Sequence, residues 1–216
     1  MARPEHRTAA KDYPDQGIAK GEKYWFVQIK TGPRSSRTMR QKSPFKRSQL
    51  TTSDYLGQLY DWEDSKAEIA SMEDAQEFAD TIRSLGEEQG EKFDNMPEGL
   101  QQGDSGQMLE ARRDACEAAA GEIEEIISEW ESAKDTWESE IEQYKTDLAA
   151  HKESQEAFDD WEATNDSLDE GEENPDPEPT VEAEPDLPDH TNDDGDEPEF
   201  DETEWLDRVR EVSVDE

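Results

Sequence analysis

The feature that most constrains the fold is a repeat of eight heptads in residues 107–164. One set of positions recurs every seven residues: Leu109, Cys116, Ile123, Trp130, Trp137, Tyr144, His151 and Phe158. A second set follows each of these by four: Arg113, Ala120, Ile127, Lys134, Ile141, Leu148, Gln155 and Glu162. This spacing predicts one long helix whose stripe is apolar in the middle and polar at its ends. A lone helix cannot bury such a stripe, so it must face the preceding helix, a second copy of itself, or both.

The preceding helix is predicted over residues 51–93, with a possible joint near 64–71. Thr51 is the expected N-cap, with Asp54 three residues later. Residues 94–106 contain one proline and three glycines and are expected to form a loop. Folded back from this loop, the shorter first helix covers about two-thirds of the stripe. Self-association or a frayed helix end would account for the rest, and the residues expected to self-associate are Ile123, Ile127, Trp130, Trp137, Ile141, Tyr144 and Leu148.

The composition indicates that part of the chain is extended or disordered. Of 216 residues, 30% are hydrophobic and 38% are charged, which is little apolar material for one compact globule. Residues 165–200 are acidic, contain six prolines and lack lysine and arginine, and they are predicted to be a disordered linker. Residues 201–212 then favour a short amphipathic helix. Its expected partner-binding residues are Trp205, Leu206, Val209 and Val212.

The amino-terminal quarter has the opposite charge. Residues 1–50 contain twelve Lys/Arg and four Asp/Glu, which is a net charge of +8. The whole chain has a net charge of −38, so residues 51–216 together carry −46. Residues 23–50 contain eight Lys/Arg and no acid. The aromatic and β-branched run Lys23–Lys30 predicts a strand, Gly32-Pro33 a turn, and residues 37–42 a second strand. We therefore expect a small basic β-hairpin in residues 22–50, preceded by a flexible arm in residues 1–21.

A basic segment without local carboxylates is suited to phosphate, and neighbouring aromatic rings can stack on unpaired bases. The residues expected to contact DNA or RNA are Tyr24, Trp25, Phe26, Lys30, Arg34, Arg37, Arg40, Lys42, Lys46 and Arg47. The alternative is that these cations pair with the acidic helices or tail of the same chain. The two can coexist, since an acidic tail that competes with phosphate would act as an autoinhibitor.

Sequence motifs for catalysis and cofactors are absent. There is no phosphate-binding glycine loop, dinucleotide fingerprint, nucleophile elbow or zinc-protease motif, and the three histidines are scattered. We expect no enzymatic activity, no cofactor and no metal site. Cys116 is the single cysteine, and no apolar run reaches the ~18 residues of a membrane span. We therefore expect no membrane partner and a location in the cytoplasm.

Three stretches together resemble a family of uncharacterised proteins of tailed phages and prophages. They are KGEKYWF (20–26), RSQLTTSDYLGQLYDWED (47–64) and NMPEGLQQGDSGQMLEARRDACE (95–117). The resemblance covers residues 18–127, and the family has no assigned activity. It implies a phage gene context and hence the cytoplasm of a host cell. The segment WFVQIKTGPRSSR and the acidic tail depart from the family pattern.

These features predict a mainly α protein: a long helical hairpin or coiled coil, with a basic β-hairpin before it and a disordered acidic tail after it. The first functional hypothesis is a non-enzymatic phage protein whose basic segment binds nucleic acid and whose coiled coil self-associates. The alternative is an acidic DNA mimic or adaptor that captures a host protein through its helices and its C-terminal segment. A virion or assembly component is also compatible with the coiled coil.

Overall fold

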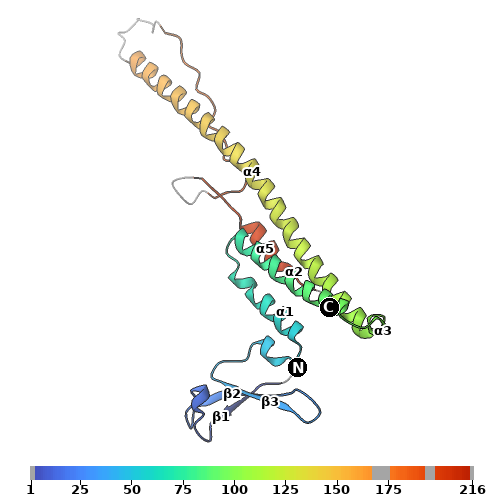
Figure 1. Ribbon diagram of the computed structural model, residues 1–216. Helices are drawn as coiled ribbons and strands as arrows, with labels where there is room; N and C mark the ends of the chain where they lie inside the picture. Colours follow the sequence, from blue (N-terminus) through green and yellow to red (C-terminus); the bar gives the residue numbers. More distant parts are fainter. Residues whose placement is uncertain (1–2, 167–175, 193–197, 215–216) are drawn as a thin grey trace. The chain divides into compact units, whose positions relative to one another are not determined.

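The protein is mainly helical, with a small antiparallel sheet near its amino terminus and one long helix (Figure 1). The structure, a computed structural model, describes residues 3–166, 176–192 and 198–214. The strands are β1 (Glu5–Thr8), β2 (Lys23–Lys30), β3 (Ser36–Gln41), β4 (Thr191–Asn192) and β5 (Glu199–Phe200). The helices are α1 (Asp54–Ser65), α2 (Met72–Asp94), α3 (Glu98–Gln101), α4 (Asp104–Asp166) and α5 (Thr203–Glu211). Short 3-10 helices are η1 (Pro14–Gln16), η2 (Arg47–Leu50) and η3 (Lys66–Glu68).

The chain divides into two compact units. The first contains the described residues up to Ile127 and those from Leu206 onward, and the second contains Ser128–Trp205. The sheet, α1, α2 and α3 belong to the first unit, whereas β4 and β5 belong to the second.

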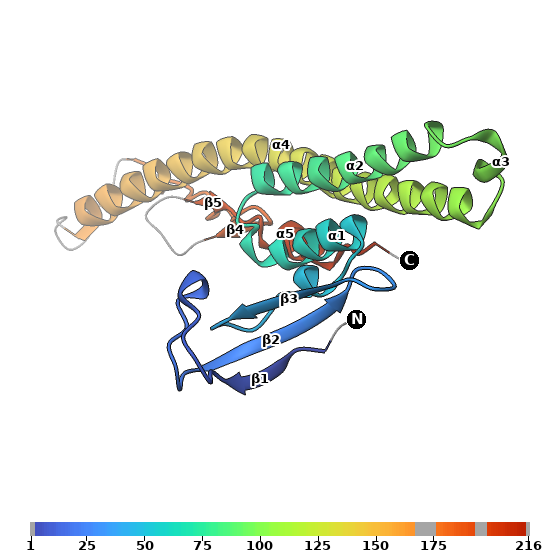
Figure 2. The ribbon, with the colours of Figure 1, turned by 60° about the horizontal axis from the view of Figure 1, so that its bottom comes forward.

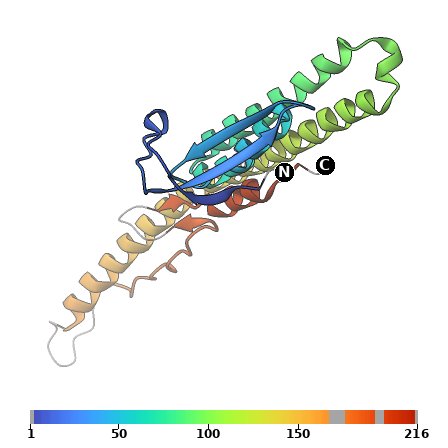
Figure 3. The same ribbon diagram turned by 90° about the horizontal axis from the view of Figure 1, so that it is seen from below.

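The sheet has three strands in the order β1-β2-β3, one more than the hairpin predicted from sequence (Figure 3). β2 and β3 form the expected hairpin, in which Phe26 is opposite Arg40. β1 pairs with the other edge of β2 and places Glu5 opposite Phe26 and Arg7 opposite Tyr24. Side chains of directly paired residues lie on the same face of a sheet. These residues therefore share one face, which we call the outer face.

The prediction of a flexible arm over residues 1–21 is wrong for the part that the structure describes. Besides β1, the chain folds back on itself so that the Tyr13 amide donates to the Ile18 carbonyl at 2.8 Å and the Ala9 amide to the Glu22 carbonyl at 2.9 Å. Gly17 adopts a left-handed φ of 63°, which favours glycine at this turn. Ala9 and Ile18 are 3% and 1% exposed, and they form a small core together with Tyr24 of β2.

Two helices replace the single helix predicted over residues 51–93. α1 is capped by Ser53, whose hydroxyl accepts from the Leu56 amide, and not by Thr51 as predicted. The chain breaks at η3, within the predicted joint, and α2 begins with a reciprocal capping box between Ser71 and Asp74. Hydrogen bonds from the Ala70 amide and from Ser71 hold the pKa of Asp74 below its usual value.

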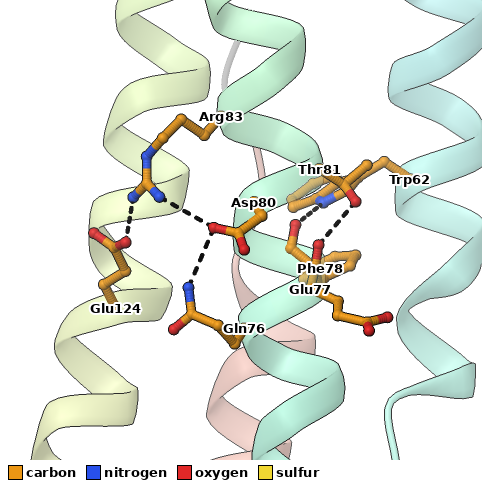
Figure 4. Close-up of polar contacts among 8 residues, drawn as sticks. All are labelled: Trp62, Gln76, Glu77, Phe78, Asp80, Thr81, Arg83 and Glu124. Atoms are coloured by element: carbon orange, nitrogen blue, oxygen red, sulfur yellow. Dashed lines mark hydrogen bonds and ion pairs between the residues drawn. The ribbon is translucent and has the colours of Figure 1, made fainter.

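Aromatic stacking and a buried hydrogen bond join α1 to α2. The rings of Trp62 and Phe78 are stacked, with centroids 4.2 Å apart. Trp62 Nε1 also donates to the Phe78 carbonyl oxygen at 2.9 Å, which satisfies a buried donor (Figure 4). Arg83 of α2 forms ion pairs with Asp80 and, on α4, with Glu124. These contacts connect three helices of the first unit.

The amino-terminal part of α4 buries its apolar stripe, and α2 runs antiparallel to it (Figure 1). Cys116 and Ile123 are both fully buried. A Cβ atom added to Gly86 would lie 3.0 Å from Cys116 Cβ and 3.3 Å from the Arg113 carbonyl oxygen. Glycine therefore allows α2 and α4 to approach closely. Of the partners predicted for the stripe, the preceding helix is the one observed here.

In the second unit, residues 176–192 run back along α4. Trp161 Nε1 donates to the Asp176 carbonyl oxygen at 2.9 Å. The Glu182 amide donates to Ser154 Oγ at 3.0 Å, and the Glu182 carbonyl oxygen lies 2.7 Å from His151 Nδ1. Main-chain groups of the acidic segment are thus held by polar side chains of α4. The predicted disordered linker is not confirmed for these residues, and the rest of it lies partly outside the described residues.

A second contact lies nearer the middle of α4. Trp137 Nε1 donates to Thr191 Oγ1 at 2.9 Å, and its ring lies 5.6 Å from that of Phe200. Thr191 and Phe200 are opposite each other in the β4–β5 pair. This two-stranded sheet was not predicted, because the surrounding sequence is mostly acidic and has few of the β-branched residues that indicate a strand.

The chain itself covers much of the stripe that was predicted to self-associate. Ile123, Ile127 and Ile141 are buried, and Trp130, Trp137, Tyr144 and Leu148 are half-buried. A coiled coil is therefore not confirmed, and covering these side chains does not require a second copy.

Alanine substitutions at two helical glycines test the close approach of α2 to α4. Gly121→Ala should raise the free energy of unfolding by about 0.5–1 kcal/mol, because no atom lies within 4 Å of the added Cβ and alanine favours helix. Gly86→Ala should lower it by about 1 kcal/mol, because the added Cβ meets Cys116 and Arg113. Denaturant unfolding of both variants measures the difference. Equal stabilisation by the two substitutions would contradict close packing at Gly86.

Candidate functional site

The candidate site is the basic head, which we define as residues 3–50. Two of the eight cations in residues 23–50 have carboxylate partners: Lys42 pairs with Glu22 at 3.1 Å and Arg47 with Glu63 at 3.0 Å. The other six form no ion pair with any carboxylate among the described residues. They are Lys23, Lys30, Arg34, Arg37, Arg40 and Lys46.

The ion pair at Lys42 reduces the positive charge at one edge of the sheet. The Ala19 amide donates to Glu22 at 2.8 Å, and this hydrogen bond, followed by that from Lys42, holds the pKa of Glu22 below its usual value. Glu22 therefore stays ionised beside Lys42. Both side chains are exposed, so this pair contributes little stability and leaves Lys42 able to exchange partners.

The three aromatic residues predicted to stack on bases have different environments. Tyr24 is 5% exposed and packs in the small core with Ala9 and Ile18, so its ring is not available to a ligand. The ring of Trp25 lies 5.0 Å from that of His6, its partner across the strands, on the face opposite to Phe26. Phe26 alone of the three lies half-buried on the outer face.

Arginine side chains cover the ring of Phe26 on the outer face. The guanidinium carbon of Arg7 lies 3.7 Å from the ring centroid, and that of Arg40 lies 5.5 Å from it. Arg40 also lies 4.8 Å from the ring of Tyr13. Arg40 Nε is buried and has no hydrogen-bond partner among the described residues. The outer face thus presents guanidinium groups lying over aromatic rings rather than a bare aromatic ring.

Arg7 and Tyr13 were not predicted as site residues, because both lie in the segment interpreted as a flexible arm. One sequence signal could have found them. Pro14-Asp15-Gln16-Gly17 is a turn signal, and a turn here can return the chain towards the predicted strand. The short polar strand Glu5–Thr8 has no apolar alternation that would have identified it.

The opposite face of the sheet, the inner face, is turned towards η2 and α1 (Figure 2). Val27 and Ile29 are 1% and 6% exposed on this face. An open cavity of about 670 Å³ lies between the sheet and the start of α1, and Arg37 lines it together with Asp54 and Asp61. Arg37 therefore shares this cavity with two carboxylates and lies on the side of the sheet away from Arg7. It is the least suited of the predicted cations to act with the outer face.

The apolar residues predicted to bind a partner through α5 are buried. Leu206, Val209 and Val212 are 7%, 0% and 3% exposed in the first unit. Arg210 Nη2 donates to the Ile69 carbonyl oxygen at 2.7 Å, and Lys66 Nζ donates to the Val212 carbonyl oxygen. The prediction of a free partner-binding motif is therefore wrong for these residues, because the joint between α1 and α2 binds the segment within the chain.

Trp205, the fourth predicted partner-binding residue, belongs to the second unit and is 5% exposed. Its ring lies 5.4 Å from that of Phe200 and 4.9 Å from that of His190. The indole is therefore part of an aromatic cluster of that unit and is not available to a partner.

Comparisons with known proteins give no functional information. No protein-family model, no curated protein and no solved structure matches the chain. None of the helices in the described part combines the length and apolar character needed to cross a membrane. The function must therefore be inferred from the residues of the chain itself.

The burial of α5 leads to a test of its role. Val209→Ala should lower the free energy of unfolding by about 2 kcal/mol, because the lost methyl groups are fully buried. Ser213→Ala, an exposed position in the same segment, is the control and should change it by less than about 0.5 kcal/mol. Thermal or denaturant unfolding measures both. If Val209→Ala left stability unchanged, α5 would be a free motif after all.

Proposed function

We propose that the protein binds nucleic acid through its basic head and has no catalytic role. The observation that carries the proposal is that six of the eight cations in residues 23–50 lack a carboxylate partner within the described part of the chain. Unpaired cations gathered in a small head attract phosphates, and binding releases the counterions of the nucleic acid. Cations used for internal stability would instead be paired with the abundant acids of the helices.

The spacing of these cations favours contact along a phosphate backbone. Lys30 ends β2, Arg34 lies in the turn before β3, and Lys46 precedes η2, so the charges are spread over the head. Such contacts are independent of base sequence. The negative charge of the remaining chain opposes non-specific wrapping, so nucleic acid should engage the head alone.

The resemblance to tailed-phage and prophage proteins adds a context to this proposal. We infer a phage-encoded protein that acts on nucleic acid in the cytoplasm of the host cell. Self-association through α4 is not needed for this role, because much of the stripe is covered within the chain.

The adaptor hypothesis is less well supported. It relied on α5 as a free segment, and the apolar side chains of α5 are buried. An acidic DNA mimic remains the alternative, since α4 and the tail retain their negative charge. This alternative predicts no binding of nucleic acid at any salt concentration.

Fluorescence anisotropy of a labelled oligonucleotide of about 12 nucleotides, titrated with the full chain across a salt series, tests the proposal. The double variant Lys30→Gln, Arg34→Gln should bind more weakly and reduce the slope of log K against log salt by about two. Lys145→Gln, Lys152→Gln changes the net charge equally on α4 and should behave as the wild type.

Two results would contradict the proposal. One is the absence of binding by the wild-type chain even at low salt, which would favour the DNA mimic. The other is an equal loss of affinity in both double variants, which would show that net charge matters and the head does not. Deletion of residues 166–216 is unsuitable as a test of tail inhibition, because it removes Val209 from the core.

A further inference from the structure

The position of Arg7 suggests a contact that differs from phosphate binding. Its guanidinium lies over the ring of Phe26, 3.7 Å from the centroid, and is held there by Glu5. Arg7 Nε and Nη2 donate to the same carboxylate oxygen, Oε2 of Glu5, at 2.8 and 2.6 Å. β1 carries Glu5 and Arg7 on one face two residues apart, and β2 supplies the ring beneath them.

Glu5 compensates the charge of Arg7, so Arg7 is a poor phosphate ligand compared with Lys30 or Arg34. Arg7 instead offers the flat face of its guanidinium group as a surface for stacking. One face of the guanidinium lies on Phe26, and the side chain remains 45% exposed. A guanidinium plane fixed in this way can stack on a nucleobase, as aromatic rings do.

The neighbouring strand extends this stacked surface. Arg40 of β3 lies on the other side of β2, near both Phe26 and Tyr13. Three strands therefore contribute one row of alternating planar cations and rings across the outer face. Bases of a duplex are stacked on one another and cannot reach such a row, whereas bases of a single strand can.

We propose that the head prefers single-stranded nucleic acid, with an unpaired base stacked on the outer plane of Arg7. This inference rests on the proposed function and deepens it by naming the class of ligand. Phosphates contact the unpaired cations Lys30 and Arg34, and the base contacts Arg7. Arg7 thus contributes to binding by stacking on a base, and Lys30 and Arg34 contribute by attracting phosphates.

The test compares three labelled ligands of equal length: a single strand, its duplex, and a single strand of abasic sites. The wild-type chain should bind the single strand about tenfold more tightly than the abasic strand, because only the former offers bases to stack. Arg7→Lys keeps the charge but removes the plane. It should lose about tenfold in affinity for the single strand and be unchanged for the other two ligands.

Arg113→Lys is the matched control: it makes the same change on α4, where Arg113 pairs with Asp114 outside the head, and should leave all three affinities unchanged. Thermal unfolding of both variants checks that the head remains folded. Equal wild-type affinity for the single strand and the abasic strand would overturn the inference and needs no variant. An equal loss by Arg7→Lys on the abasic strand would also overturn it. In this assay, the result that would contradict the proposed function is binding to none of the three ligands by the wild-type chain.

Discussion

The close packing of α2 against the first part of α4 is the interaction on which the rest of the first unit depends. With 30% hydrophobic residues and a net charge of −38, the chain has few apolar side chains to bury and strong self-repulsion to overcome. It concentrates the available burial along one stripe, where Cys116 and Ile123 are fully enclosed. Gly86 permits the short helix-to-helix distance that this burial needs. α1 and α5 then add to the same core through Trp62 and Val209.

Separation of charge along the chain explains why the head differs from everything that follows it. The acids of the helices lie on exposed faces, and the cations of residues 23–50 are mostly unpaired within the described residues. Keeping cations together without partners has an electrostatic cost that a structural role would not require. A polyanionic ligand would offset this cost, which is why binding of nucleic acid is the function that the head supports best.

Elements that depend on local residue patterns were predicted from the sequence. Elements that depend on contacts between distant parts of the chain were missed. The heptads fixed α4 closely, and the run Lys23–Lys30 identified β2, because periodicity and residue type act within a few turns or one strand. β1 was missed because its four polar residues gain order from pairing with β2, and Arg7 was missed with it. The apolar face of α5 was predicted correctly, but periodicity cannot tell whether a partner or the chain itself covers that face. The acidic composition of residues 176–192 likewise concealed their hydrogen bonds with α4.

Amide chemical-shift mapping by NMR on the full chain, titrated with a single-stranded oligonucleotide, tests the central claim most directly. The account predicts that the perturbed amides cluster on the outer face and its turns, around Arg7, Phe26 and Arg34. Amides of α4 and of residues 176–192 should remain unchanged. Perturbations confined to α4, or none at all at low salt, would contradict the assignment of nucleic-acid binding to the basic head.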